Sequence, residues 1–558
     1  MNGMSKLAAM GTVAVLAGTA FAAQAETRQE QMAAHRGGTL QLVAHTAGGT
    51  IDPQINYTSQ YWQLFQFVYD GLLTFKKADG AEGGVLVPDL AEAIPEPQDG
   101  GMTYVFKLRD GIKFSDGREV TVADVVASFQ RIFKVSGPTS GTFYNGIVGA
   151  DKCLESPTDC TLEGGVVGDE AARTVTFHLV QPDPEFFMKI AVPHASILPA
   201  DTPSSDVGVS PIPGTGPYMF TTYNPNESLM LERNPNFKEW SVDAQPDGFV
   251  DHIVFSFGLT DEGEVTAVQN GQADWMFDQP PTDRLSEIGT QNADQVHVNP
   301  LTAFWYAPLN VNLAPFDDLR VRQALNYAVD RNALVGLFGG PVLAQPVCQI
   351  LPPNFPGHEP FCLYTKDPGS EWSAPDMEKA RALVEESGTK GQKVTVISED
   401  TVVSRDVGTY LASVLSDLGY EATVKAISAN IQFTYIQNTN NNVQISVSQW
   451  YQDYPAASNF LNVLLSCASF HPGSDASVNI SGFCDKEIDG QMQAVMKQAI
   501  TDPEGANVEW AKIDRAMMEK APLVPLFTPK NVDFLSTRVG NYMFSSQYKW
   551  VISQAWVQ

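Results

Sequence analysis

Several short segments of the chain alternate hydrophobic and polar residues with a period of two, which is the pattern of half-buried β-strands. They lie at residues 37–45 (GGTLQLVAH), 393–398 (KVTVIS), 421–428 (EATVKAIS) and 443–449 (VQISVSQ). Residues 102–117 (MTYVFKLRDGIKFSDG) alternate in the same way, with Tyr104, Phe106 and Leu108 on one face. We expect a β-hairpin in this last segment, because a Gly-containing turn follows the alternating run.

Helical periodicity marks other segments. Thr121 is predicted to cap a helix, with Asp124 three residues later in the capping-box position. Apolar residues along this helix form one stripe that we expect to pack in the core: Val122, Val125, Val126, Phe129, Ile132 and Phe133. Further helices are predicted at 61–73, after Asp317, at 375–387 before Gly388, and at 406–418 before Gly419.

In the second half of the chain the predicted strands and helices alternate. This order implies an α/β layer with crossover connections between its strands. Ligands of open α/β sheets bind beyond the carboxyl ends of the strands. The stretch QWYQDYP at 449–455 lies at such an end and places one carboxylate, Asp453, among aromatic residues. It is therefore a plausible binding site.

The first residues have the pattern of a secretory signal peptide. Lys6 carries a positive charge, residues 7–22 are apolar, and Ala23 and Ala25 form an A-x-A cleavage site before Glu26. The apolar run is short for a membrane span, and no cysteine follows it that could carry a lipid. We expect residues 1–25 to be removed and the rest, without a lipid anchor, to be exported as two or three domains.

Net charge and the spacing of the cysteines reduce the number of function classes that fit the chain. The net charge of −29 argues against nucleic acid or an anionic membrane surface as a partner. Six cysteines fall into sequence-local pairs that suit short loop disulfides in an exported protein, with free buried thiols as the alternative. The pairs are Cys153 with Cys160, Cys348 with Cys362, and Cys467 with Cys484. No C-x-x-C motif supports zinc binding or redox exchange.

Sequence motifs for catalysis are missing. The chain has no G-x-S-x-G, H-E-x-x-H, G-x-x-x-x-G-K-[ST] or strand-following G-x-G-x-x-G motif. Its 8 histidines are scattered, so we expect no metal site and no cofactor. A glycosidase-like acid pair stays open, because its members need only be close in space and the chain has 64 acidic residues.

Ordered blocks along nearly the whole mature chain resemble the extracytoplasmic solute-binding proteins of peptide-type ABC transporters, the family 5 group of dipeptide- and oligopeptide-binding proteins. The longest block is LAEAIPEPQDGGMTYVFKLRDGIKFSDGREVTVADVVASFQRI at 90–132. Others are GTGPYMF (214–220), LERNPNF (231–237), LNVNLAPFDDLRVRQALNYAVDR (309–331) and SQWYQDYPAASNFLN (448–462). The export signal fits this role independently.

The resemblance implies an α/β, two-lobed periplasmic binding protein-like (type II) fold, hinged around a central ligand cleft, with an additional inserted domain. Lobe I would comprise residues 36–80, 205–300 and 526–558, the inserted subdomain 81–204, and lobe II 301–525. It also implies a monomer in the periplasm that passes a small-molecule ligand to the membrane permease of an ABC importer. The family carries peptides but also opines, sugars, nickel chelates and haem, so the ligand stays open.

The same resemblance implies roles for residues of the 448–462 block. Asp453 would receive the α-ammonium group of the ligand, for which a charge-assisted hydrogen bond is suited. The backbone of Gln449, Trp450 and Tyr451 would pair with an extended peptide as an added strand. The Trp450 and Tyr451 rings would form apolar walls, with core packing as the alternative for Trp450. Asp453 could instead bond its own loop amides.

Other candidates come from elsewhere in the chain. In the family, the loop after IDPQ supplies residues from the opposite lobe, which points to Tyr57, Thr58 and Ser59, with turn chemistry as the alternative. Weaker aromatic candidates, for which core packing is the alternative, are Tyr144, Phe304, Trp305 and Tyr306.

Two departures from the family pattern concern the ligand. The second acid of a D-Y-x-D-P motif is absent after Asp453, and no arginine lies just before Trp450. Arg405 could bind a ligand carboxylate, or it could be an ordinary surface residue. Two other classes of function stay open: a secreted hydrolase that uses a carboxylate pair, and a chaperone-like protein that binds unfolded chains.

Overall fold

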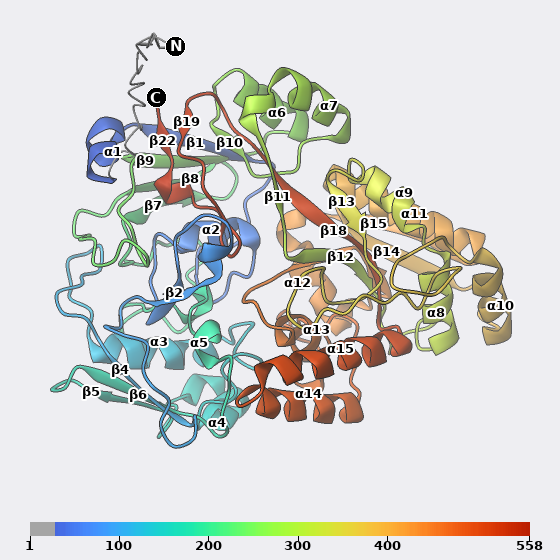
Figure 1. The fold of residues 1–558 in the computed structure, drawn as a ribbon, viewed down its shortest axis with the longest axis horizontal. Helices are drawn as coiled ribbons and strands as arrows, with labels where there is room; N and C mark the ends of the chain where they lie inside the picture. Colours follow the sequence, from blue (N-terminus) through green and yellow to red (C-terminus); the bar gives the residue numbers. More distant parts are fainter. Residues whose placement is uncertain (1–27) are drawn as a thin grey trace, which may run out of the picture.

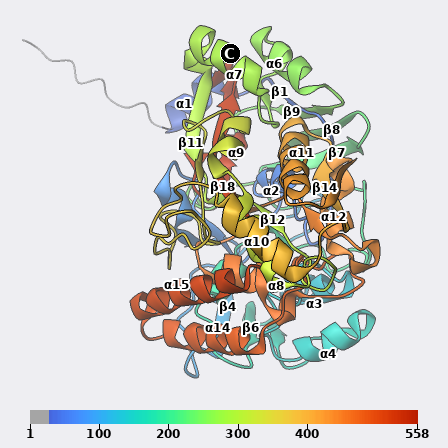
Figure 2. The same ribbon diagram turned by 90° about the vertical axis from the view of Figure 1, so that its right-hand side faces the viewer.

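The computed structural model describes residues 28–558 and shows an α/β protein of two lobes (Figures 1 and 2). The predicted signal peptide and its cleavage site lie outside the described residues. In Figure 1 the blue and green part of the chain forms one lobe, and the yellow and orange part forms the other beside it. The predicted two-lobed fold is confirmed.

A five-stranded mixed sheet lies at the centre of the first lobe, in the order β10–β1–β9–β8–β7. β1 is parallel to β9 and β10, whereas β8 is antiparallel to β7 and β9. The strands are β1 (Thr39–Ala44), β7 (Tyr218–Asn224), β8 (Ser228–Arg233), β9 (His252–Phe257) and β10 (Trp275–Met276). The helices of this part are α1 (Arg28–His35), α2 (Ser59–Phe65), α6 (Asp261–Gln269) and α7 (Thr282–Gln291).

Residues 81–204 carry a small sheet of their own, in the order β4–β6–β5. Its strands are β4 (Thr103–Lys107), β5 (Val166–Asp169) and β6 (Thr174–His178). Helices α3 (Val122–Lys134), α4 (Ala150–Glu155) and α5 (Phe186–Lys189) accompany it, and the ribbon β2 (Leu73–Phe75) with β3 (Leu86–Pro88) precedes it. In both views this part lies at the end of the molecule opposite α6 and α7 (Figures 1 and 2).

The predicted hairpin at 102–117 is wrong. β4 pairs with β6, Tyr104 opposite Phe177, rather than with the residues that follow it. The alternation of Tyr104, Phe106 and Leu108 reports burial of one face, and this face packs in a core that includes α3. A period of two identifies a strand but not its partner, which here lies about 70 residues further along the chain.

The second lobe contains two sheets. One is parallel, in the order β15–β14–β16, and confirms the predicted α/β layer; the other has the order β11–β18–β12–β17, with β13 also paired to β18. The strands are β11 (Val296–Pro300), β12 (Ala303–Pro308), β13 (Ala344–Pro346), β14 (Lys393–Glu399), β15 (Glu421–Ile427), β16 (Ile445–Ser446), β17 (Ser448–Tyr451) and β18 (Leu523–Phe534). The helices are α8 (Leu319–Ala328), α9 (Arg331–Leu337), α10 (Met377–Ser387), α11 (Val402–Asp417), α12 (Ala429–Gln437), α13 (Ser458–Leu465), α14 (Lys486–Ala499) and α15 (Pro503–Lys520).

Two antiparallel strands connect the lobes. The first part of β18 pairs with β12 in the second lobe, and its last part pairs with β11. The next residue, Leu535, bridges to Trp275 in the sheet of the first lobe. After β18 the chain ends in short strands on the first lobe, at the red end of the ribbon in Figure 1: β19 (Val539–Gly540), β20 (Phe544–Ser545), β21 (Lys549–Trp550) and β22 (Trp556–Val557).

Most predicted helices are present, with shifted ends. The capping box is confirmed, since Thr121 accepts from the Asp124 backbone and its own N–H donates to the Asp124 carboxylate at 2.8 Å. α10 ends before Gly388, which is left-handed with φ 67°. Asp318, not Asp317, caps α8, and α11 begins at Val402 rather than at 406.

The helix predicted at 61–73 is wrong over its second half. α2 ends at Phe65, and the chain then turns so that the backbone carbonyls of Phe67 and Val68 accept from Tyr218 and Gly216. Leu73 already belongs to strand β2. Tertiary hydrogen bonds to the first sheet thus override the apolar pattern of this segment.

Hydrophobic packing ties residues 81–204 to the second lobe as well as to the first. One core contains the central sheet of the first lobe and the C-terminal strands. A second core is continuous from the small sheet into the second lobe. The rings of Phe143 and Tyr454 meet edge to face across this boundary, with centroids 5.3 Å apart. Residues 81–204 therefore share one hydrophobic core with the second lobe.

A buried ion pair fixes the loop that leads into α2. Arg131 of α3 is 4% exposed and Asp52 is 0% exposed, and Arg131 Nη1 donates to Asp52 Oδ1 at 3.0 Å. The same guanidinium donates to the carbonyls of Pro203 and Ser205 and to the Gln54 side chain. The IDPQ loop is thereby held against α3, which sets the position of the residues that follow it.

We expect Arg131→Met to lower the free energy of unfolding by about 3 kcal/mol or more, because it leaves the Asp52 carboxylate buried without its partner. Urea unfolding followed by circular dichroism measures the loss. Arg118→Met is the control, since Arg118 pairs with Asp116 and Asp201 on the surface at 50% exposure and is expected to cost less than about 1 kcal/mol. Equal losses in both variants would contradict this assignment.

Candidate ligand-binding cavity between the lobes

A cavity of about 760 Å³ lies between the lobes. The first lobe lines it with residues 46–50 and 55–60 and with the end of β10, and the second with β17, the end of β14 and part of α12. Residues 547–549 of the C-terminal segment complete the wall. Its volume is in the range of small-molecule sites, about 300–1,000 Å³.

Strand β17 has a backbone edge that is not paired with another described strand. It is the last strand of its sheet, paired on one side with β12, with Trp305 opposite Gln449 and Ala303 opposite Tyr451. No strand of residues 28–558 covers its other edge. Because Gln449, Tyr451 and Asp453 all line the cavity, this free edge is accessible to a ligand with backbone-like N–H and C=O groups.

Asp453 lies just after β17 and is 5% exposed. Its Oδ2 accepts from the Tyr57 hydroxyl and from Asn459 Nδ2, each at 2.6 Å, and its backbone N–H donates to Asn459 Oδ1 at 2.8 Å. Within residues 28–558 it takes part in no ion pair. Burial raises the pKa of the Asp453 carboxyl to about 7, although the hydrogen bonds from Tyr57 and Asn459 lower it in part.

The bond between Tyr57 and Asp453 crosses from one lobe to the other. Tyr57 precedes Thr58, whose side chain caps α2, so the helix start orients the ring. The ring also meets Trp450 edge to face at 5.6 Å and His194 at 4.8 Å. Burial and the adjacent Asp453 raise the pKa of the Tyr57 hydroxyl, which therefore donates the hydrogen bond.

The C-terminal segment brings a cation to the same wall. Gln547 Nε2 donates to the Asp453 carbonyl, and Lys549 Nζ lies 4.0 Å from the centroid of the Tyr451 ring. Lys549 is half-buried and forms no ion pair within the described residues. Burial lowers its pKa to about 8. Lys549 also adopts a left-handed backbone, φ 61°, which is uncommon for a residue with a side chain.

The structure brings most of the predicted site residues to the cavity wall. Tyr57, Thr58 and Ser59 face Gln449, Trp450, Tyr451 and Asp453 across it, and Trp305 also lines it. Trp450 combines both predicted roles, because it is 4% exposed yet borders the cavity. Its indole N–H donates to the Asn459 carbonyl at 3.0 Å, which fixes the ring beside Tyr57.

Four predicted residues do not line the cavity. Tyr144 is fully buried between Phe129 and Phe143, and its hydroxyl donates to the Lys189 carbonyl. Phe304 and Tyr306 are buried against each other, with ring centroids 4.7 Å apart. Arg405 lies on the first turn of α11 with its side chain exposed. The three aromatic residues belong to the core, which was the alternative interpretation of each.

Sequence reasoning missed Gln547 and Lys549, which come from the far end of the chain, and the acids Asp278 and Glu399. A strand-end position was the available signal for Glu399, which is the last residue of β14. No local pattern marks the C-terminal segment, because it reaches the cavity through the fold of β18 and β21.

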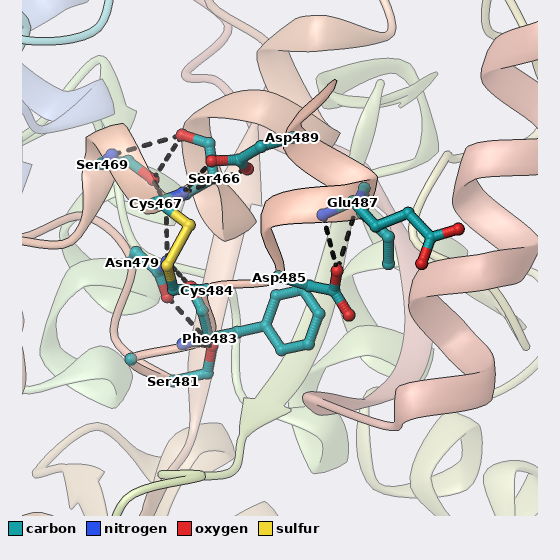
Figure 3. Close-up of a disulfide and its surroundings, with 12 residues drawn as sticks. Ser466, Cys467, Ser469, Asn479, Ser481, Phe483, Cys484, Asp485, Glu487 and Asp489 are labelled. Atoms are coloured by element: carbon teal, nitrogen blue, oxygen red, sulfur yellow. Dashed lines mark hydrogen bonds between the residues drawn. A yellow bond between two sulfur atoms is a disulfide. The ribbon is translucent and has the colours of Figure 1, made fainter. Parts of the chain in front are cut away.

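The three predicted disulfides are confirmed: Cys153–Cys160, Cys348–Cys362 and Cys467–Cys484. Figure 3 shows the last, which joins the end of α13 to the start of α14. This disulfide closes a loop, and Asn479 within the loop donates to the carbonyls of Ser466 and Phe483. Residues 474–476 of this loop border the cavity, so the disulfide fixes part of its wall.

No group of three or more His, Cys, Asp or Glu side chains within residues 28–558 has an arrangement that could hold a metal ion. Nor does any helix of this part have both the length and the apolar character to cross a membrane.

Comparisons with known proteins give relatives along nearly the whole chain. A family model described as bacterial extracellular solute-binding proteins, family 5 Middle, matches residues 85–471. The chain is 26% identical to the periplasmic oligopeptide-binding protein OppA of Escherichia coli (strain K12), covering 82% of this chain and 83% of OppA. It is 25% identical to di/tripeptide-binding protein 2 of Pseudomonas aeruginosa (strain UCBPP-PA14), covering 91% and 92%.

Solved structures have the same fold. Clavulanic acid biosynthesis oligopeptide binding protein 2 matches with a TM-score of 0.78 and 25% identity, covering 94% of this chain and 96% of its own. The murein tripeptide-binding protein MppA of Escherichia coli matches with a TM-score of 0.77 at 20% identity, covering 93% and 98%. At 20% identity, the match to MppA shows a similar fold and nothing more.

We expect Asp453→Asn to raise the melting temperature of the ligand-free protein at pH 8 and to change it little at pH 5. The carboxyl binds its proton up to a pKa of about 7 in the folded chain but titrates near 3.8 when exposed. As pH rises from 3.8 to about 7, the contribution of this carboxyl to the free energy of unfolding therefore falls, by on the order of 4 kcal/mol. Differential scanning calorimetry at both pH values tests this. A lower melting temperature for the variant at pH 8 would contradict it.

Proposed function

The chain belongs to the bacterial extracellular solute-binding proteins of family 5, and we propose that it captures a peptide or similar amine-bearing small molecule and delivers it to the membrane permease of an ABC importer. Periplasmic location is part of the proposal, as are a monomeric state and the absence of a nucleic-acid partner. The relatives named above are binding proteins of this kind, and the strongly negative net charge supports a partner other than nucleic acid.

The observation that carries the proposal is a buried carboxylate without a cation, placed at a free strand edge inside the cavity. An isolated buried charge is costly, so Asp453 is held partly neutral at physiological pH. A ligand ammonium group beside it would supply the missing charge. Its hydrogen bonds to Asp453 would be charge-assisted and thus stronger than those from Tyr57 and Asn459.

The rest of a short peptide has partners along the same wall. Its backbone would pair with the open edge of β17, as an added strand does, which gives affinity independent of side chains. Lys549, rather than Arg405, is the residue that we propose for the ligand carboxylate. It lines the cavity with an ammonium group that forms no ion pair with a described residue, although the charge of the buried Asp533 acts on it, whereas Arg405 is exposed outside the wall.

We propose that the lobes follow the segments expected from the family: 36–80, 205–300 and 526–558 for the first, 81–204 for the inserted subdomain, and 301–525 for the second. β11 and β18 would act as the hinge, since both run between the lobes. Ligand entry then requires the Tyr57–Asp453 bond to open. Closure over the ligand excludes water and strengthens the polar contacts that orient it.

No catalytic step is part of this proposal. A hydrolase would need an acid pair on either side of a scissile bond, and capture with release makes no use of one. Binding of a peptide panel without turnover, measured by mass spectrometry of the incubated peptides, separates the carrier from the hydrolase. A saturable response to small peptides separates it from a chaperone-like protein, which would bind denatured chains instead.

We expect native mass spectrometry of the protein from its own host to show a co-purifying small ligand, and Asp453→Ala to abolish its retention. After removal of this ligand, calorimetric affinity for an amine-bearing peptide should fall about tenfold per pH unit below 7, because protonation of Asp453 removes the counter-charge. An affinity for N-acetylated peptides equal to that for free-amine peptides would contradict the anchor role of Asp453.

Lys549→Met should weaken peptides with a free carboxylate by about 10-fold or more, the loss expected for a hydrogen bond to a charged group. Peptides with an amidated C-terminus are the matched ligands, since they lack the charge that Lys549 would bind. Arg405→Met serves as the control variant and should leave both ligands unaffected. If Arg405→Met instead removes the preference for the free carboxylate, the assignment passes to Arg405.

A further inference from the structure

A second group of carboxylates faces the cavity. Binding of one ammonium group by Asp453 gives this second group no role. Glu399 ends β14 in the second lobe, and Asp278 follows β10 in the first. Both line the cavity. Asp261, at the start of α6, lies at the same wall, and Glu264 of the same helix is 0% exposed behind it.

Glu264 has an unusual environment. Both of its carboxylate oxygens are buried, and no Lys or Arg among the described residues forms an ion pair with them. The carboxyl group and the backbone N–H of Asp278 are within hydrogen-bond reach of Glu264. Burial first, and then the charge of Asp278, raises the pKa of Glu264 to about 11. Two acids thus lie close together in a buried position.

Glu399 completes the group from the other lobe. Its carboxylate accepts from Gln449 Nε2 at 3.4 Å, and the Thr401 side chain is also within hydrogen-bond reach. Burial, together with the charges of Asp278 and Asp400, raises the pKa of Glu399 to about 7. Glu399 and Asp278 thus line one cavity from different lobes, their charges act on one another, and neither forms an ion pair within the described residues.

Neighbouring cations offset the negative charge of this group only in part. The His45 backbone N–H donates to Asp278 Oδ2 at 2.7 Å, while the His45 ring bonds the Leu259 carbonyl. A positive charge on that ring would lower the pKa of Asp261 and of Asp278, but burial outweighs it and the pKa of each carboxyl is raised. Arg405 lies near Asp261 but is exposed and outside the cavity wall. Six acids line the whole cavity against two lysines: Asp206, Asp261, Asp278, Glu399, Asp453 and Asp475, with Lys530 and Lys549.

Stabilisation of a helix explains the position of only one of these acids. Acids in the first turn of α6 favour the helix dipole, which accounts for Asp261. It does not account for Asp278 and Glu399, which lie on strand ends of different lobes. Nor does it explain why Glu264 is fully buried beside a second acid, which is costly for a carboxyl group.

We propose that Glu399 and Asp278 form a second cation-binding subsite, which takes the ammonium or guanidinium group of a Lys or Arg side chain on the bound peptide. The inference rests on the proposed function and names its substrate class: short peptides with a basic side chain. Glu264 does not line the cavity and belongs to the subsite only through its contact with Asp278.

Strand geometry indicates which side chain reaches the subsite. Gln449, the neighbour of Glu399, lies four residues before Asp453 along the β17 segment, a span of roughly 13 Å if fully extended. A peptide anchored by its N-terminal ammonium at Asp453 and laid along β17 advances at a similar rise per residue. Its second or third residue, with the reach of a long basic side chain, would then lie beside Glu399.

Calorimetry with ligand-free wild-type protein tests the proposal, using Ala-Lys-Ala and Ala-Ala-Lys against the same peptides with norleucine, which keeps the length of the lysine stem without its charge. We expect at least one lysine peptide to bind about 10- to 100-fold more tightly than its norleucine partner. Glu399→Gln and Asp278→Asn, made separately so that one misfolded variant does not end the test, should each bring this ratio towards one. Asp406→Asn, the same charge change on the exposed face of α11, should keep the wild-type ratio.

The outcomes separate this inference from the proposed function. Equal binding of lysine and norleucine peptides overturns the second subsite and leaves peptide capture in place. A preference for lysine that survives in both Glu399→Gln and Asp278→Asn also overturns it. Binding of none of the peptides would overturn the proposed function itself. A linear diamine, 1,5-diaminopentane, that binds more tightly than every peptide would overturn the peptide as substrate class.

Discussion

The burial of the Asp453 carboxylate without a cation is the constraint on which the rest of the site depends. Tyr57 and Asn459 donate to one of its oxygens, and neither carries a charge. A partly satisfied buried acid keeps a strong preference for a positive partner. Because Tyr57 belongs to the opposite lobe, the same bond that stabilises the acid also joins the two lobes. Under the proposed function, ligand recognition and lobe closure would thus be coupled through a single carboxylate.

Three of the acids of the cavity share one structural origin. Glu399 ends β14, Asp453 follows β17 by two residues, and Asp278 follows β10 by two residues. Carboxyl ends of strands from both lobes therefore converge on one cleft, which is where open α/β folds place their ligands. Burial raises the pKa of each of these carboxyls and so costs stability, a common consequence of building a binding site into a folded chain. The disulfide-closed loop at 474–476 and the buried Arg131–Asp52 pair hold the walls around them.

Much of the fold could be predicted from the pattern of residues. Period-two alternation located β1, β4, β14 and β15, and a capping box and a terminal glycine located the ends of α3 and α10. The pairing of β4 with β6 could not be predicted, because alternation reports a buried face and not a partner. The helix expected at 61–73 failed for a related reason, since hydrogen bonds from 216–218 redirect the chain after Phe65.

The sequence by itself determined the family resemblance and the expectation of a site near a strand end: Trp450, Tyr451 and Asp453, without catalytic or metal motifs. The tertiary structure decided which side chains meet there. Tyr144 and Tyr306 are buried in the core, and Lys549 reached the wall because β18 returns the C-terminus to the cleft. Local sequence patterns indicate which side chains are buried and where helices and strands end. Contacts between residues hundreds of positions apart depend instead on the packing of whole lobes.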